Sequence, residues 1–378
     1  MVLGIYIAWL VHGRNQMGIA VDPQADLDNP PPLEDLPLIS VIVPARNEAR
    51  NIRQSIQALL AQTYPNYELI VVNDRSGDAT PEILAELARA DPRLEVIQGS
   101  ELPDGWAGKP HALLQGVSAS RGEWLCFVDA DTFARPELLS SAYLQALKRK
   151  ADMFSIFTDQ ELGSFWERTI LPLVFLGLSF GFPLDRVNDP TKPDAISNGQ
   201  FILIKRQVYK KIGGHASVKD RIDEDKAIAI LVKRAGYRLV LADGRKVAST
   251  RMYTSLPEMW EGWTKNIYLG LLDRLWLLTF GALLGLFVSI LLPFWLVAGL
   301  FWLISGGGLA AFVLTGEGCT LWAYLLWRRF QACRAFNISG WYAFTFPLGA
   351  LLFTAMMLAS AFNVISGRGV SWKGRRYH

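Results

Sequence analysis

The stretch ISVIVPARNE, residues 39–48, is a β-branched apolar run that ends in polar residues. Short runs of the same kind recur as far as residue 241, and helical patterns separate most of them. A run of about 4–8 such residues is typical of a β-strand. The predicted strands are Ile39–Val43, Tyr67–Asn73, Arg93–Ile97, Trp124–Asp129, Asp152–Phe157, Ala195–Ile204 and Tyr237–Leu241.

Helical patterns occupy the intervals between these strands. The predicted helices are Glu48–Ala61, Pro81–Ala90, Pro110–Ala119, Pro136–Lys148 and Glu224–Ala235. Strands that alternate with helices favour an α/β fold, in which helices cover both faces of a mostly parallel sheet. Ligands bind beyond the carboxyl ends of the strands in such sheets, so candidate site residues are sought there.

The composition indicates a membrane protein with a large folded domain. Of the 378 residues, 51% are hydrophobic and 19% are charged, which is too apolar for an ordinary soluble protein and too polar for a pure membrane bundle. Residues 275–327 carry one charge, Glu317, and are long enough for two spans of about 20 residues. With a further apolar stretch at residues 341–365, transmembrane helices are predicted within 275–366.

Other segments are assigned from their composition. Residues 1–14 are predicted to be an N-terminal membrane segment; a signal peptide is disfavoured because no basic residue precedes the apolar run and no small-residue cleavage site follows it. Thr169–Leu184 is predicted to lie in the membrane surface or against other helices. The other predicted segments are a linker over 15–37, an α/β domain over 38–256, an amphipathic interface helix over 257–274 and a basic tail over 367–378.

Charge and cysteine content exclude some classes of partner. The net charge is +3, and no basic stripe with interleaved aromatic residues suggests that the chain binds nucleic acid. Cys126, Cys319 and Cys333 have neither the spacing of a metal site nor that of a disulfide framework, which fits reduced thiols in the cytoplasm. The oligomeric state stays open.

Three predicted strands end in polar side chains. Asn47 and Glu48 follow the first strand, Asp74 follows the second, and Asp129 and Asp131 follow the fourth. Because the last two are two residues apart, they project to the same side of an extended chain. Paired carboxylates bind a hard divalent cation, which can bridge the oxygens of a diphosphate. The alternative is a pair of turn-forming acids.

Other residues could bind or react with a ligand. Asp74 could accept hydrogen bonds from a nucleotide base or ribose. Lys109, in a glycine-rich stretch before a predicted helix, could meet a phosphate or be a solvated loop lysine. Glu224 and Asp225 open a predicted helix, where the helix dipole favours acids; Asp225, and less so Glu224, could instead remove a proton from an acceptor hydroxyl.

Trp260, Trp263 and Lys265 lie just before the first predicted span. Aromatic side chains at this position could form an interfacial belt. They could equally form the wall of an acceptor or diphosphate site that opens toward lipid, and the sequence does not decide between the two.

Together these motifs resemble the family 2 glycosyltransferases, a large inverting group with a nucleotide-sugar-binding GT-A fold. The resemblance covers residues 38–266. It rests on Val-Pro-Ala-Arg-Asn-Glu (43–48), Asn-Asp-x-Ser-x-Asp-x-Thr (73–80), Gly-Lys-Pro-His-Ala-Leu (108–113), Asp-Ala-Asp (129–131) and Glu-Asp (224–225). The stretches 104–109 and 263–266 look like those of bacterial lipid glycosylators, and the carotenoid- and hopanoid-associated glycosyltransferases are the nearest kin.

The resemblance implies a GT-A mixed sheet over 38–256 as the catalytic domain, and it implies roles for single residues. Pro44, Ala45, Asn47, Glu48 and Asp74 would hold the donor nucleoside. Lys109 would approach the donor. Asp129 and Asp131 would form the Asp-x-Asp element, with Mg²⁺ or Mn²⁺ held chiefly by Asp131. Asp225 would be the catalytic base.

The expected activity is transfer of a sugar, with inversion, from a nucleotide-diphosphate sugar to a lipid hydroxyl at the cell membrane. Two alternatives remain within the enzymes. A polyprenyl-phosphate sugar transferase has an anionic acceptor and needs no base. A processive polysaccharide synthase is disfavoured, because residues 260–266 read Trp-Glu-Gly-Trp-Thr-Lys-Asn where such enzymes carry Gln-x-x-Arg-Trp.

The topology is only partly predicted. Nucleotide sugars are cytoplasmic, so the catalytic domain is expected in the cytoplasm as part of a multi-pass protein. Three spans after an inside domain would place Lys373 and Arg375 outside, against the usual preference of basic residues for the cytoplasmic side. The number of spans and the side of the C-terminus therefore stay open.

Overall fold

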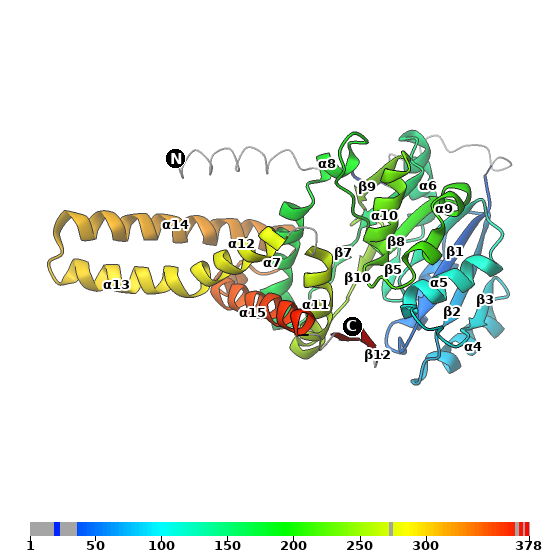
Figure 1. Cartoon of the computed structure of the whole chain (residues 1–378), viewed down its shortest axis with the longest axis horizontal. Helices are drawn as coiled ribbons and strands as arrows, with labels where there is room; N and C mark the ends of the chain where they lie inside the picture. The colour runs from blue at the N-terminus through cyan, green and yellow to red at the C-terminus, as the bar shows by residue number, and fades with distance from the viewer. Residues whose placement is uncertain (1–18, 23–35, 272–274, 367–369, 373–374, 378) are drawn as a thin grey trace. The chain divides into compact units, whose positions relative to one another are not determined.

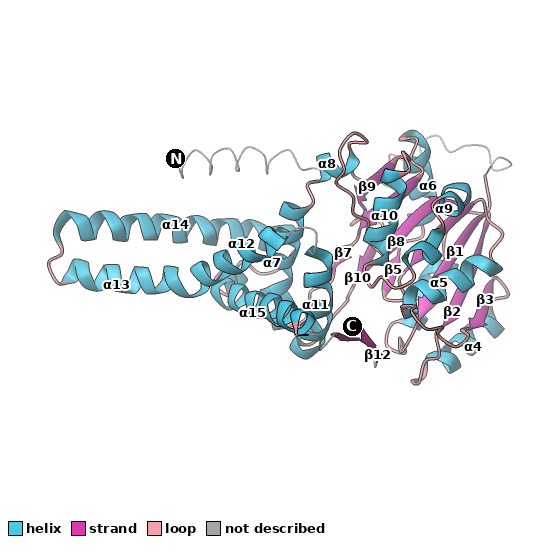
Figure 2. Cartoon of the chain, viewed as in Figure 1, coloured by secondary structure: helices cyan, strands magenta, loops and turns pink. Residues whose placement is uncertain are grey.

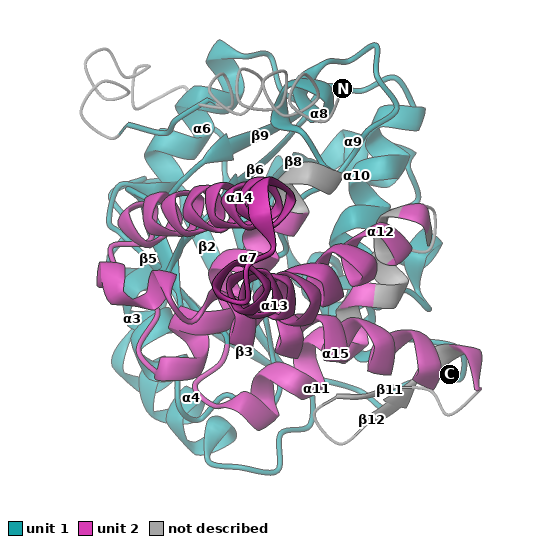
Figure 3. Cartoon of the chain, turned by 90° about the vertical axis from the view of Figure 1, so that its left-hand side faces the viewer, with its two compact units in different colours: residues 1–161, 182–252 teal, residues 162–181, 253–378 magenta. Residues whose placement is uncertain are grey.

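The protein is described by a computed structural model covering residues 19–22, 36–271, 275–366, 370–372 and 375–377 (Figure 1). Figure 3 shows the chain divided into two compact units. Unit 1 comprises residues 1–161 and 182–252, and unit 2 comprises residues 162–181 and 253–378. The predicted N-terminal membrane segment and most of the predicted linker lie outside the described residues.

Unit 1 is built around a seven-stranded sheet with the strand order β3-β2-β1-β4-β8-β6-β9 (Figure 2). Its strands are β1 (Ile39–Ala45), β2 (Tyr67–Asn73), β3 (Leu94–Gln98), β4 (Trp124–Val128), β6 (Met153–Phe157), β8 (Phe201–Lys205) and β9 (Leu239–Asp243). All neighbours are parallel except β8, which runs antiparallel to both β4 and β6. The sheet is therefore mixed, as the resemblance implied.

The predicted strand Ala195–Ile204 begins later than expected. Strand β8 starts only at Phe201, because residues 195–200 form a loop held by side-chain hydrogen bonds. Asn198 donates from Nδ2 to the Ile156 carbonyl at 3.1 Å, and Ser155 accepts the Asn198 N–H at 2.9 Å. This loop ends beside the carboxyl end of β4, where it contributes to the site described below.

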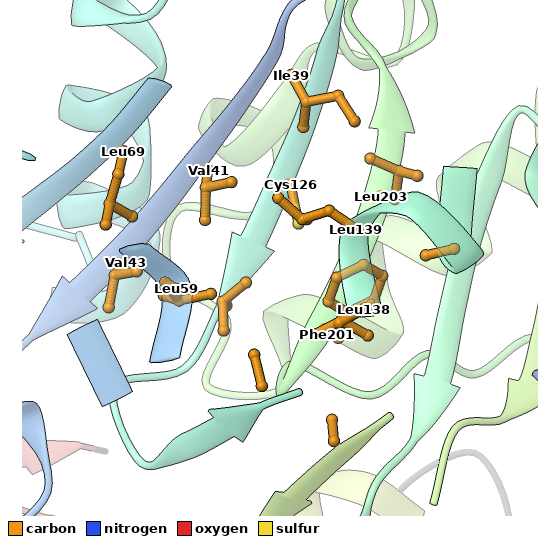
Figure 4. Close-up of a cluster of buried hydrophobic side chains, with 14 of the residues drawn as sticks. Ile39, Val41, Val43, Leu59, Leu69, Cys126, Leu138, Leu139, Phe201 and Leu203 are labelled. Carbon is orange, nitrogen blue, oxygen red and sulfur yellow. The ribbon is translucent and has the colours of Figure 1, made fainter. Parts of the chain in front are cut away.

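Helices cover both faces of the sheet because successive side chains of a strand point to opposite faces. The helices of unit 1 are α3 (Ile52–Leu60), α4 (Thr80–Ala90), α5 (Gly108–Ala119), α6 (Leu138–Lys148), α8 (Leu184–Asn188), α9 (Arg206–Lys211) and α10 (Glu224–Arg234). One face packs on α3, α4 and α6, and Figure 4 shows side chains of β1, β4 and β8 meeting those of α3 and α6. The other face packs on α5, α9 and α10.

Two short additions extend unit 1. Strands β5 (Thr132–Ala134), β7 (Asp159–Gln160) and β10 (Ala248–Thr250) form a small sheet in the order β5-β10-β7. Within the predicted linker, Ala20 forms a parallel bridge with Asp243 at the end of β9, and Val21 is fully buried in the core. Part of the segment predicted as a linker therefore packs as an edge of the sheet.

Unit 2 is helical. It contains α7 (Phe165–Gly181), α11 (Leu256–Leu271), α12 (Leu275–Leu286), a π-helical turn η4 (Phe287–Leu291), α13 (Leu292–Ile304), α14 (Gly308–Ala335) and α15 (Phe346–Ile365). Three helices are long and apolar enough to cross a membrane, over Thr279–Ile304, Gly308–Ala335 and Phe346–Asn363. Figure 1 shows α13 and α14 side by side as a long hairpin, and the two helices are in contact.

Helix α7 interrupts the predicted 38–256 domain. The chain leaves unit 1 after Glu161 and returns to it at Phe182, so residues 162–181 belong to the helical unit. Gly349 of α15 lies so close to α7 that a Cβ there would be 2.5 Å from the Thr169 carbonyl oxygen. The apolar run of α7 thus packs against other helices, one of the two places predicted for it. The described part of the predicted basic tail forms a hairpin of β11 (Val370–Trp372) and β12 (Arg375–Tyr377).

Candidate active site

The end of β4 delivers a carboxylate to a cluster of charged side chains. All five residues of β4 are buried, and Asp129 follows directly after them. Lys109 reaches the same point from the first turn of α5, and its Nζ lies 2.7 Å from Asp129 Oδ1 and 2.8 Å from Glu224 Oε1. The lysine is therefore the shared counter-charge of two acids that are 95 residues apart.

Helix α10 begins with the other acids of the cluster. Glu224 is buried, whereas Asp225 is half-buried. The Gly199 N–H donates to Asp225 Oδ2 at 2.9 Å, and the Lys226 N–H donates to Oδ1 at 2.7 Å. These two hydrogen bonds hold Asp225 in one orientation. A carboxylate oxygen has a second lone pair, so it can still accept a proton.

Gly199 allows these charges to meet. A Cβ at this position would lie 2.8 Å from Lys109 Nζ, 3.3 Å from Asp225 Oδ2 and 3.4 Å from Asp129 Oδ2. Any side chain would therefore press on three charged groups at once. Gly199 was not among the predicted site residues, because a single glycine in a predicted strand carries no sequence signal for a catalytic site.

The cluster changes the protonation behaviour of its members. Burial raises the pKa of Glu224 to about 7, although the charge of Lys109 opposes this effect. Burial likewise raises the pKa of Asp225, opposed by Lys109 and by the two backbone hydrogen bonds. Burial would lower the pKa of Lys109, but Asp129, Glu224 and Asp225 together raise it well above its usual value. The site thus holds a charged lysine beside two acids, Glu224 and Asp225, whose pKa is raised.

His215 completes the wall of the same pocket. This pocket is lined by Pro44, Lys109, Leu113, Phe127, Val128, Asp129, Gly199, Ile202, His215, Glu224 and Asp225. His215 Nδ1 lies 2.8 Å from the Tyr209 hydroxyl oxygen. Burial and the charge of Lys109 lower the pKa of His215 to about 3, so its ring is neutral at physiological pH. No pattern in the sequence marks His215 as a site residue. It follows two glycines at a short 3₁₀ turn.

The ends of β1 and β2 form a second group of the predicted residues. The Asp74 N–H donates to the Ala45 carbonyl at 2.8 Å, and Asp74 is buried. Asn47 has a positive φ of 53° and accepts the Gly77 N–H at its Oδ1. The Glu48 N–H donates to Thr80 Oγ1 at 2.8 Å. The two loops are thus interlocked, which fixes the residues predicted to hold a nucleoside.

Asp131 lies beside the charged cluster in sequence but is not part of its pocket wall. It directly precedes β5, and its carbonyl accepts a hydrogen bond from the Thr250 hydroxyl at 2.9 Å. Among the described residues, Asp74 and Asp131 do not line the pocket that contains Asp129 and Asp225. The strand ends are spread over the width of the sheet, so this pocket contains Asp129 and Asp225 but neither Asp74 nor Asp131.

Comparison with known proteins identifies the domain. The family described as "Glycosyl transferase family 2" matches residues 40–213, which include Lys109, Asp129 and Gly199 of the site but end before Glu224 and Asp225. This part of the chain is similar to the family 2 glycosyltransferases. The 4,4'-diaponeurosporenoate glycosyltransferase of Staphylococcus aureus is 27% identical over 235 residues, which are 61% of this chain and 61% of that protein.

Two further proteins are similar to this chain. The probable glycosyltransferase YdaM of Bacillus subtilis is 27% identical over 251 residues, 62% of this chain and 54% of that protein. The chain therefore matches less than two thirds of the length of these curated relatives. A mannosyltransferase from Pyrobaculum calidifontis, solved with GDP-Man and Mn²⁺, has a TM-score of 0.53 at 20% identity and covers 95% of both chains. This likeness confirms the predicted fold.

The acids of the glycosyltransferase domain fit a metal ion that is shared with a ligand. Among the described residues, no group of three or more His, Cys, Asp or Glu side chains could hold a metal by itself. Mg²⁺ is commonly bound by only one or two carboxylates, together with substrate phosphates. The assignment of this ion to Asp131, with Asp129 beside it, stays a prediction.

The predicted acceptor residues lie in unit 2, on α11. Trp263 is buried and stacks near Tyr253 with ring centroids 6.2 Å apart, whereas Trp260 is 37% exposed. Trp263 Nε1 has no hydrogen-bond partner among the described residues. Lys265 is half-buried on the same helix. One tryptophan is thus a packing residue, and the other is available to a ligand or to lipid.

Proposed function

We propose that the chain transfers a sugar, with inversion, from a nucleotide-diphosphate sugar to the hydroxyl group of a membrane lipid. The observation that carries this proposal is the fixed carboxylate of Asp225 beside the Lys109–Asp129–Glu224 cluster. The match of residues 40–213 to the family 2 glycosyltransferases supports it. Three apolar helices in the same chain support a substrate that is already in the membrane. A relative named for glycosylation of 4,4'-diaponeurosporenoate supports an apolar acceptor.

In the proposed reaction, Asp225 takes the proton of the acceptor hydroxyl as this oxygen attacks the anomeric carbon. The Gly199 and Lys226 N–H groups keep the carboxylate in place, so little reorganisation is needed in the transition state. The sugar–phosphate bond breaks on the opposite side, so the anomeric configuration inverts.

The donor would lie across the strand ends, with the nucleoside near Pro44, Ala45, Asn47, Glu48 and Asp74. Lys109 would keep Asp129 and Glu224 in place and add positive charge near the leaving diphosphate. Mg²⁺ or Mn²⁺, held by Asp131 with a contribution from Asp129, would neutralise the diphosphate when bound. Trp260 and Lys265 are proposed to contact the acceptor, whereas the predicted role of Trp263 is replaced by packing within unit 2. The catalytic unit would face the cytoplasm, where nucleotide sugars occur.

The test is transfer by the full chain in lipid nanodiscs that contain a bacterial lipid extract. A panel of labelled nucleotide sugars is offered with Mg²⁺ or Mn²⁺, and lipid products are identified by mass spectrometry. We expect a glycosylated lipid whose formation falls at least about 100-fold in Asp225→Asn, the usual size of a lost general base, while donor binding is retained.

The outcomes separate this proposal from its alternatives. A sugar found only on a polyprenyl phosphate, with Asp225→Asn fully active, would replace the proposal by a polyprenyl-phosphate sugar transferase, because that acceptor is already an anion. A long polysaccharide product would indicate a processive synthase. Release of the nucleoside diphosphate without any glycosylated lipid would also contradict the proposal.

A further inference from the structure

Helix α7 limits where a membrane can lie around unit 2. The chain leaves unit 1 at residues 161–162 and returns to it at 181–182, and the strands β6 and β8, which precede and follow this excursion, are neighbours in one sheet. A helix that crossed the membrane here would put half of that sheet on each side. Both ends of α7 therefore lie on the side of unit 1, and α7 runs along the membrane surface.

Helix α14 reaches this surface with its second half. Arg329 donates from Nη2 to the carbonyl oxygens of Arg168 and Thr169, near the start of α7. It follows Gly308 by 21 residues, or about 32 Å at 1.5 Å per residue, close to the roughly 30 Å of a bilayer core. At its other end α14 is joined to α13 by residues 305–307, which carry no charge. The α13–α14 hairpin is thus long enough to cross the membrane and return.

Helix α15 begins at the level of this contact between α14 and α7. A Cβ on Gly349 would lie 2.5 Å from the Thr169 carbonyl oxygen and 2.9 Å from Leu173 Cδ1, so the start of α15 touches α7. Arg329 donates to the same carbonyl of Thr169. The first turn of α15 is therefore already about one core thickness, roughly 30 Å, away from the turn between α13 and α14.

The next contacts of α15 lead further from that turn. A Cβ on Gly285 of α12 would overlap Thr354 Oγ1. A Cβ on Gly281, one turn earlier in α12, would lie 3.1 Å from Met357 Cε. These glycines precede Ile304, the end of α13, by 19 and 23 residues, or about 29 and 35 Å of helix. As α15 proceeds, it moves away from the far side of the membrane.

The last turns of α15 pack on α11. The Ser360 hydroxyl donates to the Thr264 carbonyl, and β11, which follows α15, is also in contact with α11. Helix α11 continues from unit 1 at residues 252–253 and carries Glu258 and Glu261, acids that are costly inside hydrocarbon. Both ends of α15 are thus held by helices that belong to the side of unit 1.

The exposed side of α15 is a narrow apolar stripe. Its members recur at intervals of three, four or seven residues, as on one face of a helix, and they are Leu348, Leu351, Leu358, Phe362 and Ile365. Figure 3 looks nearly along α13 and shows α15 from its side, so the two helices point in different directions. A helix that lies in the membrane surface presents one such apolar face to the acyl chains.

We propose that α15 lies in the membrane surface on the side of unit 1, with the apolar stripe against the acyl chains of that leaflet. Residues 253–377 then cross the membrane twice, once through α12 and α13 and once through α14, although α15 is also long and apolar enough to cross. The basic hairpin of β11 and β12 stays on the side of Arg328 and Arg334, as basic residues beside spans commonly do. This inference does not depend on the proposed transfer reaction.

The test labels single cysteines with a membrane-impermeant maleimide, in intact bacterial cells and after permeabilisation. Ser305→Cys marks the α13–α14 turn, Ser366→Cys the end of α15 and Glu82→Cys unit 1, and all three positions are exposed. The wild type gives the background from the native cysteines. With unit 1 in the cytoplasm, we expect Ser305→Cys to react in intact cells. The other two variants should stay at background until permeabilisation.

The pairing of the variants decides the outcome. If Ser366→Cys reacts together with Ser305→Cys, α15 crosses the membrane and the proposal is overturned. If Ser366→Cys and Glu82→Cys both react in intact cells while Ser305→Cys does not, unit 1 faces outward but the proposal stands. Should Ser366→Cys melt below the wild type, an epitope added after His378 and detected by antibody in the same two preparations reports the same side.

A spin label tests whether the stripe meets lipid. The nitroxide is attached to Phe362→Cys in lipid nanodiscs, with Cys319→Ala to remove the exposed native thiol. We expect more collisions with dissolved oxygen, which concentrates in lipid, than with a water-soluble nickel chelate. The label on Glu82→Cys, in the same background, is the control in water and should show the reverse. A preference for nickel at Phe362→Cys would place the stripe in water and overturn its assignment.

Discussion

Lys109 joins two acids that are far apart in the sequence, Asp129 and Glu224. Its glycine-rich surroundings predicted a donor phosphate contact, whereas the structure pairs it with Asp129 and Glu224. The pairing joins the start of α5 to the start of α10, so nothing local in the sequence could reveal it. Asp129 and Asp225, in contrast, could be identified from the sequence. Asp129 directly follows a strongly patterned strand, and Asp225 lies in the first turn of a strongly patterned helix.

Gly199 offers a prediction at this scale. Gly199→Ala should lower transfer at least about tenfold, because its Cβ would lie 2.8 Å from Lys109 Nζ and displace the charged cluster. The free energy of unfolding should change by less than about 1 kcal/mol, since a lysine end can move. The measurement is kcat with saturating donor. Gly316→Ala, where a Cβ meets nothing within 4 Å, is the control. Unchanged kcat in Gly199→Ala would contradict the assigned role.

The raised pKa of Glu224 predicts that the stability of the protein depends on pH. Its pKa is about 7 in the folded protein and about 4.5 when unfolded, so the folded state binds more protons between these values. The stability contributed by this proton is complete below about pH 4.5 and is lost as the pH rises through 7. Relative to the wild type, Glu224→Gln should therefore gain up to about 3 kcal/mol across this window and gain nothing more above it.

The measurement is the melting temperature of the wild type and of Glu224→Gln between pH 4 and 8.5, in EDTA and without donor. The control is Glu101→Gln, which changes an exposed acid of unit 1. Parallel curves for the wild type and Glu224→Gln across the whole range would show that the acid is not held protonated by burial.

At the scale of elements, the edge of the sheet next to β9 yields a prediction. Val21 is fully buried, and its N–H donates to the Asp243 carbonyl at 2.9 Å, although these residues fell within a predicted linker. Val21→Ala should lower the free energy of unfolding of unit 1 by about 2 kcal/mol, because it removes two buried methyl groups. Denaturant titration measures this loss. The control is Ala20→Ser, which changes the exposed neighbour and should leave the free energy of unfolding nearly unchanged. Equal free energies of unfolding in the two variants would refute the edge packing.

The same edge shows what sequence patterns can and cannot supply. The strands β1, β2 and β4 were predicted closely because each is an apolar run with polar residues at its end. The pairing of Ala20 with Asp243 was not, because four residues carry no periodicity and their partner lies more than 200 residues away. The late start of β8 had a related cause: residues 195–200 look extended, but the Asn198 side chain takes over their backbone partners.

For the whole molecule, the assignment of α7 to the helical unit has a consequence for truncation. A chain that ends at Met252 keeps α7 but loses α15 and α14, against which α7 packs. Ile170, Leu171 and Val174, all buried in the full chain, would then be exposed. We expect this truncated chain to sediment as aggregate without detergent.

A second truncated chain supplies the comparison. Both truncated chains begin at residue 19, so they lack the predicted N-terminal membrane segment. If residues 162–181 are also replaced by a short Gly-Ser linker, unit 1 should stay in the supernatant after high-speed centrifugation, because its core is complete without them. Equal sedimentation of both chains would show that α7 is not the source of insolubility. The sequence alone favoured the simpler reading of one uninterrupted domain, because a 16-residue apolar run can be a core helix as readily as a surface one.

The excursion of the chain through α7 also affects what a protease could release. The polypeptide passes between the two units three times, at residues 161–162, 181–182 and 252–253. A single cut after Met252 would leave unit 1 covalently joined to α7, because residues 162–181 connect the two parts of unit 1. Release of unit 1 without α7 would need a cut at each of the three crossings, so one cut would not separate it from unit 2.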